Sequence, residues 1–355
     1  MKILRNAALI MFVFLLIAVV SLTLVYKTNI EPVDANDATL IEVEVPQGAT
    51  KKEVGILLKE KGLIRNSDFF LVYLKLFPSK DFKATTYYLN KSMDLKTIVG
   101  ELEKGNDINK NQIKITFKEG INITDVADII ATNTNNTKED VLKLLQDEEY
   151  LDELIEKYWF LDESIKNKKL YYSLEGYLFP DTYYYASKDV TVKEIFAKML
   201  KKEDEVLSTY KDEIVNSKYS LKDIVIMASI IEKEGKKRDF DKISSVFYNR
   251  LSSSMKLESC ATLYYGARKK FSDVGIATSE MIANNNPYNT YQNAGLPVGP
   301  ISLPGKEALD ASVHPAKGED MYFLSDNEGN TYFFKTYAEH QAKQRELEKA
   351  GKWQR

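Results

Sequence analysis

The sequence of 355 residues is poor in cysteine and histidine, and its net charge is only −3. Cys260 alone allows no internal disulfide and no thiolate metal cluster. His314 and His340 are too few for a histidine-rich metal site, although carboxylates could still form one. The 49 basic and 52 acidic side chains provide no concentrated basic surface. We therefore expect no nucleic-acid partner.

Proline and glycine are also sparse, with nine and 16 residues, which excludes a collagen-like or linker-dominated chain. Hydrophobic residues make up 44% and charged residues 28% of the sequence. This balance is typical of a globular protein rather than a disordered one. At roughly 100–200 residues per domain, two or three folded units are expected.

Residues 7–26 form an apolar run of 20 residues without a charge. A helix of this length would cross the roughly 30 Å core of a bilayer. Lys2 and Arg5 precede the run and acidic residues follow it, so the positive-inside rule predicts a single-pass cell-membrane protein with a cytoplasmic N-terminus. A cleaved signal peptide is the alternative, although no Ala-x-Ala site follows the run. The expected segments are a cytoplasmic stretch 1–6, a transmembrane helix 7–27 and a linker 28–38.

Two small α/β units are predicted after the linker. Residues 41–45 alternate between apolar and charged side chains, as in a half-buried strand, and a helical pattern follows from Thr50. A strand at residues 113–117 and a second helical pattern after Gly120 repeat this order, and a further helix is expected at 95–102. Such units resemble LysM modules, which bind N-acetylglucosamine polymers, although a generic α/β spacer explains them equally well. The expected boundaries are 39–109 for the LysM-like domain and 110–169 for the connecting unit.

Residues 174–185 are rich in tyrosine. Tyrosine rings can pack on the C–H face of a sugar while their hydroxyls bond its oxygens. Aromatic side chains also favour strands and fill hydrophobic cores, which is the simpler explanation of this stretch. Glu175 and Tyr177 lie here, and Glu175 could contact sugar or pair with a cation.

Residues 221–234 predict a buried helix that ends in two carboxylates. Ser220 and Asp223 resemble a capping box, and Gly235 is a natural stop. The helix is apolar on almost all sides, as buried helices are. At 100° per residue, Glu232 and Glu234 point to nearly opposite sides.

Glu232 is the candidate general acid. It shares its face with small residues that include Ser229, so a ligand could approach there. Burial and the negative end of the helix dipole both raise the pKa of such a carboxyl. An acid that is neutral near pH 7 can protonate a leaving oxygen. The alternative is a surface glutamate paired with Lys233, Lys236 or Lys237.

Several segments with distinctive sequences, one of them within this helix, lie in order along the second half of the chain. The motifs are EGYLFPDTY at 175–183, ASIIEKE at 228–234, VFYNRL at 246–251, ATLYYG at 261–266, PYNTY at 287–291, GLPVGPI at 295–301 and HPA at 314–316. Together they resemble the endolytic murein transglycosylases, the YceG-like (MltG) family. The resemblance departs at Val298, where the family usually has a second proline, and at Cys260, where some members have aspartate. We expect Cys260 to be buried and inert.

The resemblance implies an enzyme that cleaves the β-1,4 bond between N-acetylmuramic acid and N-acetylglucosamine in peptidoglycan strands. Glu232 would protonate the glycosidic oxygen and then, as a carboxylate, take the proton from the C6 hydroxyl, which closes a 1,6-anhydro ring without water. No metal or other cofactor is needed. The alternatives are a hydrolytic muramidase and a non-catalytic peptidoglycan-binding scaffold. Expected partners are glycan strands, the membrane, and cell-wall synthases with division or elongation proteins.

Residues 170–355 would form the catalytic domain. Asn249 and Arg250 could equally be a helix end packed on the core, and His314 could equally fix a turn. Residues 288–291 lie in a turn-rich loop that suits a sugar groove. The binding residues expected beside Glu232 are Glu175, Tyr177, Ser229, Asn249, Arg250, Tyr288, Asn289, Tyr291 and His314.

The last part of the chain predicts a hairpin and a charged helix. Residues 322–325 and 331–334 are apolar runs on either side of a turn sequence, and a solvated terminal helix follows from Tyr337. Together these features predict an α+β protein with one N-terminal transmembrane helix, small LysM-like units and an α/β catalytic domain. Its catalytic Glu232 is expected on a buried helix.

Overall fold

A computed structural model describes residues 11, 16, 21–105, 113–269, 275 and 277–353. The chain divides into two compact units. The first consists of Met1–Ile113 with Tyr184–Lys188, and the second of Lys114–Tyr183 with Asp189–Arg355. Helices alternate with short two-stranded sheets, so the predicted α+β class is confirmed.

The predicted transmembrane helix is not supported. Residues 21–30 are helical, but within the described part of the chain no helix is long and apolar enough to cross a membrane. A span needs about 20 consecutive residues, and the described stretch is far shorter. This finding overturns the transmembrane helix 7–27 and the membrane localisation inferred from it. Residues 1–10, 12–15 and 17–20 lie outside the described residues.

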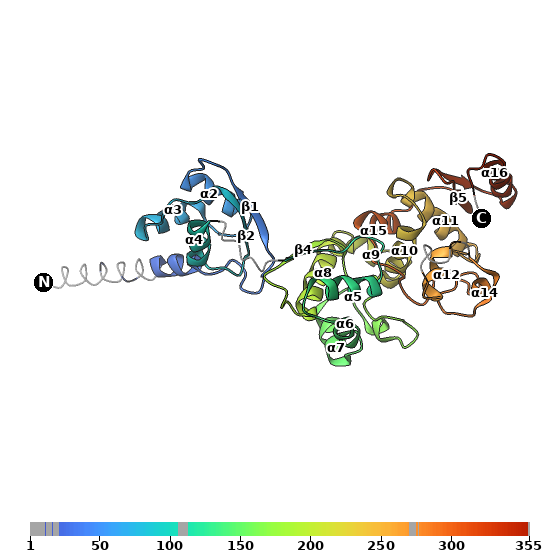
Figure 1. Cartoon of the computed structure of the whole chain (residues 1–355), viewed down its shortest axis with the longest axis horizontal. Coiled ribbons are helices and arrows are strands. Elements are labelled where there is room, and N and C mark those ends of the chain that lie inside the picture. Colours follow the sequence, from blue (N-terminus) through green and yellow to red (C-terminus); the bar gives the residue numbers. More distant parts are fainter. Residues whose placement is uncertain are drawn as a thin grey trace. The chain divides into compact units, whose positions relative to one another are not determined.

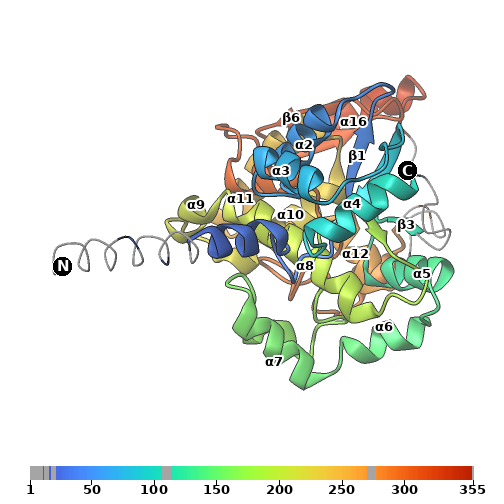
Figure 2. The same cartoon turned by 90° about the vertical axis from the view of Figure 1, so that its left-hand side faces the viewer.

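The first unit places helices on a two-stranded antiparallel sheet (Figure 2). Val43 and Val45 point inward from the first strand and are buried, as the alternating pattern predicted. The side chain of Thr50 caps the following helix in a capping box with Glu53. The elements are β1 (Ile41–Val45), α2 (Lys51–Glu60), α3 (Ser67–Leu76), β2 (Thr85–Leu89) and α4 (Leu95–Lys104).

The second unit is largely helical (Figure 1). Its first part contains β3 (Ile113–Thr116), α5 (Ile123–Asn133), α6 (Lys138–Leu144), α7 (Glu148–Lys157), the 3-10 helix η1 (Glu163–Lys166), β4 (Thr182–Tyr185), α8 (Val192–Ser208) and α9 (Lys211–Val215). The later part contains α10 (Leu221–Glu234), the 3-10 helix η2 (Lys237–Asp239), α11 (Phe240–Ser252), α12 (Cys260–Gly266), α14 (Ser279–Ala283), α15 (Lys306–Val313), β5 (Tyr322–Ser325), β6 (Thr331–Phe334) and α16 (Tyr337–Lys349). The chain passes between the two units within β3, within β4, and again after Lys188.

Helix α10 lies at the centre of this unit and packs against α11, α12 and α15 (Figure 1). Its bounds agree with the prediction, and Ser220 and Asp223 form the expected capping box. The residues from Ile224 to Ile231 are all buried, as expected for a helix that is apolar on all sides. A buried, capped helix of this kind gives Glu232 at its end a fixed position.

Two loops are hydrogen-bonded to each other beside the end of α10. The Gly120 N–H donates to the Leu303 carbonyl at 2.8 Å, and the Leu303 N–H donates to the Ile121 carbonyl at 2.7 Å. The loop before α15 is also packed closely at Gly176, where an added Cβ would lie 2.4 Å from Pro300 Cβ. These contacts hold the backbone around Glu232 in place.

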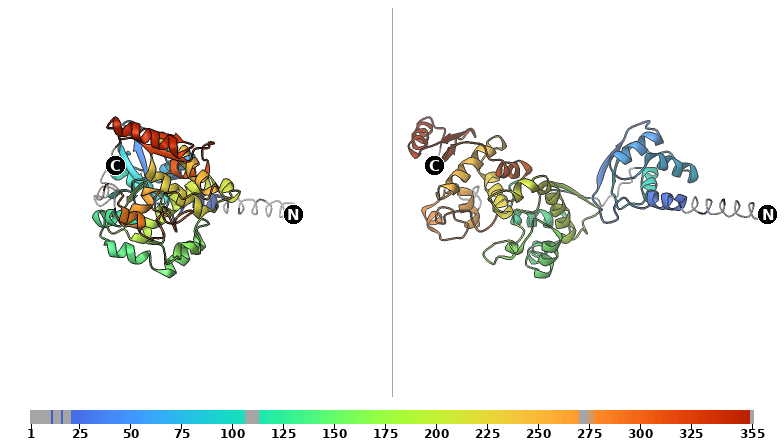
Figure 3. Two further views of the ribbon diagram at one scale, coloured as in Figure 1. Left: turned by 90° about the vertical axis from the view of Figure 1, so that its right-hand side faces the viewer. Right: turned by 180° about the vertical axis from the view of Figure 1, so that it is seen from behind.

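The predicted hairpin and terminal helix are confirmed. Strands β5 and β6 pair antiparallel, with Tyr322 opposite Phe334 and Ser325 opposite Thr331. Helix α16 packs against both strands, and Figure 3 shows it in red at the end of the chain. Among the residues of this helix only Leu347 is buried, so the helix is solvated as predicted.

Candidate active site

The carboxyl group of Glu232 lies between two glycine-containing loops. The Gly305 N–H donates to Glu232 Oε2 at 3.0 Å. On another side, a Cβ added at Gly120 would lie 3.5 Å from Glu232 Cγ, so the backbone there approaches closely. Glu232 is half-buried, because its own helix covers its stem and the two loops approach its head.

The pKa of Glu232 is raised from 4.5 to about 7. Burial is the main cause, since it penalises the charged form. The Gly305 N–H and the positive charge of Lys237 lower this pKa, and the negative charges of Glu119 and Glu307 raise it. Near neutral pH the group is therefore divided between the acid that can give a proton and the carboxylate that can take one.

Lys237 joins two acidic side chains next to Glu232. Its Nζ lies 2.8 Å from Glu119 Oε2 and 3.0 Å from Glu307 Oε2. The pKa of Lys237 is raised to about 12, with the hydrogen bond to Glu119 as the largest cause. Because both neighbouring carboxylates are bound to this ammonium group, neither is a free base beside Glu232.

The lysines that follow Glu232 do not pair with it. In the part of the chain that the structure describes, no ion pair joins Glu232 to Lys233, Lys236 or Lys237. The Nζ atoms of these lysines bond instead to the Gly120 carbonyl at 3.0 Å, the Glu328 carbonyl at 3.3 Å, and the carboxylates of Glu119 and Glu307. The alternative of a surface glutamate paired with a neighbouring lysine is therefore not supported.

Ser229 lies on the same face of α10 as Glu232, as the helical spacing predicted. Its Oγ accepts a hydrogen bond from the Ile301 N–H at 3.1 Å, and its carbonyl accepts one from Ser302 Oγ at 2.9 Å. Ser229 is completely buried. Residues 301–305 therefore cover the small-residue face on which a ligand was expected, and only its Glu232 end reaches toward solvent.

Glu234 points away from Glu232, as the spacing also predicted. Its carboxyl accepts hydrogen bonds from Ser259 Oγ and from the Ala261 N–H. Burial raises the pKa of Glu234, and the Ser259 hydroxyl partly offsets this. Since both donors belong to the first turn of α12 or its cap, Glu234 anchors that helix and is not a second acid at the same site.

Glu175 is a second buried carboxyl with a raised pKa, about 8, which burial causes. It is 2% exposed and accepts hydrogen bonds from the Ile123 N–H at 3.2 Å to each oxygen. The Tyr265 hydroxyl also donates to it, at 2.9 Å. These bonds tie the start of α5 to α12, and they satisfy a carboxyl group that burial keeps largely protonated near neutral pH.

Comparison with known proteins identifies the family. A model of the YceG-like family matches residues 43–346. The chain belongs to the YceG-like family. It is 35% identical over 316 residues to a Bacillus subtilis protein named endolytic murein transglycosylase. That match covers 88% of this chain and 86% of the Bacillus protein. It is 32% identical over 323 residues to a Streptococcus pneumoniae protein of the same name, but spans only 58% of that longer chain.

The YceG-like fold is supported by a solved structure as well. A crystal structure of a yceG-like protein from Listeria monocytogenes matches with a TM-score of 0.62 and 34% sequence identity. The match covers 85% of this chain and 98% of the Listeria chain. The architecture around α10 therefore lies within a fold already seen in the family.

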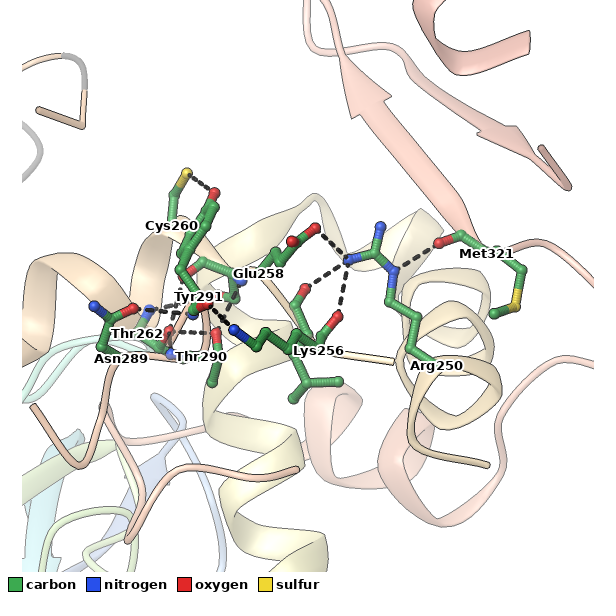
Figure 4. A network of polar contacts seen from close by, with 11 residues as sticks. Arg250, Lys256, Glu258, Cys260, Thr262, Asn289, Thr290, Tyr291 and Met321 are labelled. Carbon is green, nitrogen blue, oxygen red and sulfur yellow. Dashed lines mark hydrogen bonds and ion pairs between the residues drawn. The ribbon is translucent and has the colours of Figure 1, made fainter. Parts of the chain in front are cut away.

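In this YceG-like chain, Asn249 and Arg250 lie near the end of α11, and their side chains donate to backbone carbonyls of later segments. Asn249 Nδ2 donates to the carbonyls of residues 318 and 320, at 3.1 and 3.0 Å. Arg250 Nε donates to the Met321 carbonyl at 2.6 Å, and Nη1 donates to the Leu257 carbonyl at 2.8 Å (Figure 4). Both side chains join α11 to the segment before β5, and a role in binding stays a prediction.

The loop at residues 288–291 is largely buried, although its composition suggested a sugar groove. Tyr288 and Asn289 are 0% and 1% exposed. Asn289 Nδ2 donates to three backbone carbonyls, the shortest of them Asn284 at 2.7 Å. Tyr291 is partly exposed, and its hydroxyl lies 3.1 Å from Cys260 Sγ (Figure 4). Of these residues Tyr291 is therefore the one best placed to meet a ligand.

The remaining predicted residues lie apart from this loop. Tyr177 is 4% exposed and belongs to the core, in line with the simpler explanation of the tyrosine-rich stretch. His314 is exposed at the end of α15, and its Nδ1 lies 3.2 Å from Asp310 Oδ1. Cys260 is exposed, so the expectation that it is buried was wrong. It lies at the first position of α12, where the chain has just reached the surface.

Sequence reasoning missed the groups that surround Glu232. Glu119 and Gly120 come from the loop before α5, and Gly305 and Glu307 come from the start of α15. Lys237 was considered only as a partner of Glu232. The turn signal at Gly120 and the GLPVGPI motif were noticed, but nothing local to either indicates that the two loops meet at the end of α10.

Proposed function

We propose that this chain is an endolytic lytic transglycosylase that cleaves peptidoglycan glycan strands, with Glu232 as its acid and base. The proposed reaction breaks the β-1,4 bond between N-acetylmuramic acid and N-acetylglucosamine and leaves a 1,6-anhydro end. The observation that carries the proposal is a half-buried Glu232 with a pKa of about 7, in a chain whose relatives are named endolytic murein transglycosylases.

Glu232 can serve in both halves of this reaction. As an acid it gives its proton to the glycosidic oxygen while the bond to C1 breaks. The Gly305 N–H, 3.0 Å from Oε2, stabilises the carboxylate that results. That carboxylate then takes the proton of the C6 hydroxyl as this oxygen bonds to C1. The proton returns to Glu232, and no water is consumed.

The surroundings of Glu232 favour ring closure over hydrolysis. Glycosidases that add water generally use a second carboxylate as base or nucleophile. The acidic neighbours Glu119 and Glu307 are both bound to Lys237, so neither is free to activate water. An internal hydroxyl needs no second base, because proximity can supply roughly 7–11 kcal/mol of the barrier.

The other parts of the assignment are proposals of the same kind. Residues 39–109 would form a LysM-like glycan-binding domain, 110–169 a connecting unit and 170–355 the catalytic domain. Trimming of new strands would bring the enzyme close to cell-wall synthases and to division or elongation proteins. Chemical crosslinking of the full chain in cells would identify such neighbours.

The direct test is mass spectrometry of glycan strands digested by the full chain. We expect strand ends that are lighter than hydrolysed ends by the mass of one water. Glu232→Gln should fold and lose cleavage, whereas Glu213→Gln, at an exposed position of α9, is the matched control and should cleave normally. Reducing ends from the unchanged protein would show a muramidase, and cleavage by Glu232→Gln would refute the assignment of the acid.

A further inference from the structure

A cavity of about 590 Å³ lies beside the end of α10. Residues of η2 and the start of α11 line one side, α15 lines the other, and Tyr210 from the α8–α9 connection completes it. Its volume falls within the range of pockets that bind small organic molecules, roughly 300–1,000 Å³. The mechanism proposed above does not use this space.

The cavity adjoins the candidate catalytic carboxyl. Lys237 and Glu307 line it, and the charges of both act on Glu232. Lys306, another lining residue, directly follows Gly305, whose N–H donates to Glu232. A substituent of a sugar bound at Glu232 would therefore lie close to the cavity.

The lining carries charges of both signs. Positive groups come from Lys237, Arg238 and Lys306, and negative groups come from Asp241, Glu307 and Asp310. Lys237 is engaged by Glu307 and Glu119, but Lys306 is exposed and has no ion-pair partner among the described residues. The cavity thus suits a ligand that has carboxylates as well as an ammonium group.

We propose that this cavity binds the short peptide that murein carries on the lactyl group of its muramic acid residues. This inference rests on the proposed function, because it assumes a muramic acid residue at Glu232. A stem such as L-alanyl-γ-D-glutamyl-L-lysine has two carboxylates and one ammonium group. Lys306 and Arg238 supply positive charge in the lining for the carboxylates, and Asp310 supplies negative charge for the ammonium. Lys306 is the freest of the three, because Arg238 Nη2 already donates to the Gly329 carbonyl and Asp310 already contacts His314. The neutral sugars of the strand offer no charge for these groups.

Direct binding tests this proposal without any need for cleavage. N-acetylmuramoyl-L-alanyl-γ-D-glutamyl-L-lysine is titrated into the full chain, and binding is followed by calorimetry. We expect saturable binding that the double variant Lys306→Gln/Arg238→Gln weakens by about tenfold or more. Lys168→Gln is the matched control, since Lys168 is an exposed lysine outside the cavity lining. No binding by the unchanged protein, or equal affinity in the double variant, would overturn the proposal.

A second measurement compares strands that retain their peptides with strands from which an amidase has removed them. We expect kcat/KM to be several-fold higher on peptide-bearing strands, and the double variant to bring this ratio close to one. A ratio of one in the unchanged protein would contradict a peptide site. Because the ratio compares two substrates of one enzyme, a general loss of activity does not change it. A failure of the proposed reaction itself is recognised separately, by mass spectrometry of the strand ends.

Discussion

Replacing Gly176 by alanine tests how closely Pro300, in the loop before α15, packs against the backbone at Gly176. Gly176 has a φ of +85°, and an added Cβ would lie 2.4 Å from Pro300 Cβ. The left-handed backbone alone costs an alanine about 1–2 kcal/mol. Overpacking against a rigid proline adds about 1–3 kcal/mol. We therefore expect Gly176→Ala to lower the free energy of unfolding by about 2–5 kcal/mol.

The matched control is Gly295→Ala. Gly295 has nearly the same φ, +84°, but no heavy atom lies within 4 Å of the added Cβ, so only the backbone cost of about 1–2 kcal/mol applies. Urea unfolding followed by tryptophan fluorescence measures both, because Trp159 and Trp353 belong to the second unit. If Gly176→Ala cost no more than Gly295→Ala, the close packing on Pro300 would be refuted.

Three further predictions concern charged groups of the second unit. Glu203→Met should raise the free energy of unfolding at pH 7 by roughly 1–3 kcal/mol, because both oxygens of Glu203 are buried without a hydrogen-bond partner among the described residues; an equal gain from the exposed Glu205→Met in the same urea titration would contradict this. Lys237→Met should move the alkaline limb of the pH–rate profile to higher pH, because Lys237 lowers the pKa of Glu232 and its removal lets that pKa rise. A move to lower pH would contradict this effect of Lys237. Between pH 4.5 and about 7, Glu232 keeps its proton in the folded chain but has released it in the unfolded chain, so the free energy of unfolding falls as the pH rises. In Glu232→Gln this contribution is absent, so its urea midpoint should fall less over the same pH range than that of the unchanged protein.

The parts of the fold that sequence predicts well have strong local signals. Helix α10 begins at Leu221 and ends at Glu234 as expected, because the capping box and the apolar run mark its start and extent. The hairpin of β5 and β6 was predicted to the residue, since a turn sequence separates two apolar runs. In both cases the information lies within a few residues of the element that it specifies.

The surroundings of Glu232 could not be predicted in the same way. The Gly305 N–H and the Lys237–Glu119 ion pair join residues that are far apart in the sequence. Helical spacing showed which face of α10 carries Glu232, but it contains no information about which loop covers that face. The direction of the pKa shift was predicted from burial, whereas the opposing effects of neighbouring charges required the tertiary structure.

Composition does not distinguish polar side chains that bind a ligand from those that bond to the backbone. Asn289 and Arg250 were predicted to bind sugar, with core packing as the equal alternative for Arg250; their donors reach internal carbonyls, and the binding roles stay predictions. A polar residue in a loop has the same sequence signature whether its partner is a ligand or the chain itself. The apolar run at residues 7–26 predicted a membrane span that the described residues do not support.

The central claim is that Glu232 holds its proton near neutral pH. It is tested most directly by NMR titration of the full chain labelled with 13C at the glutamate side-chain carboxyls, with Glu232→Gln used to assign the signal. We expect this carboxyl to titrate with a pKa of about 7, and its midpoint to agree with the alkaline limb of the pH–rate profile. A pKa near the ordinary 4.5 would mean that the group is ionised at neutral pH, and it would contradict the role of Glu232 as the acid.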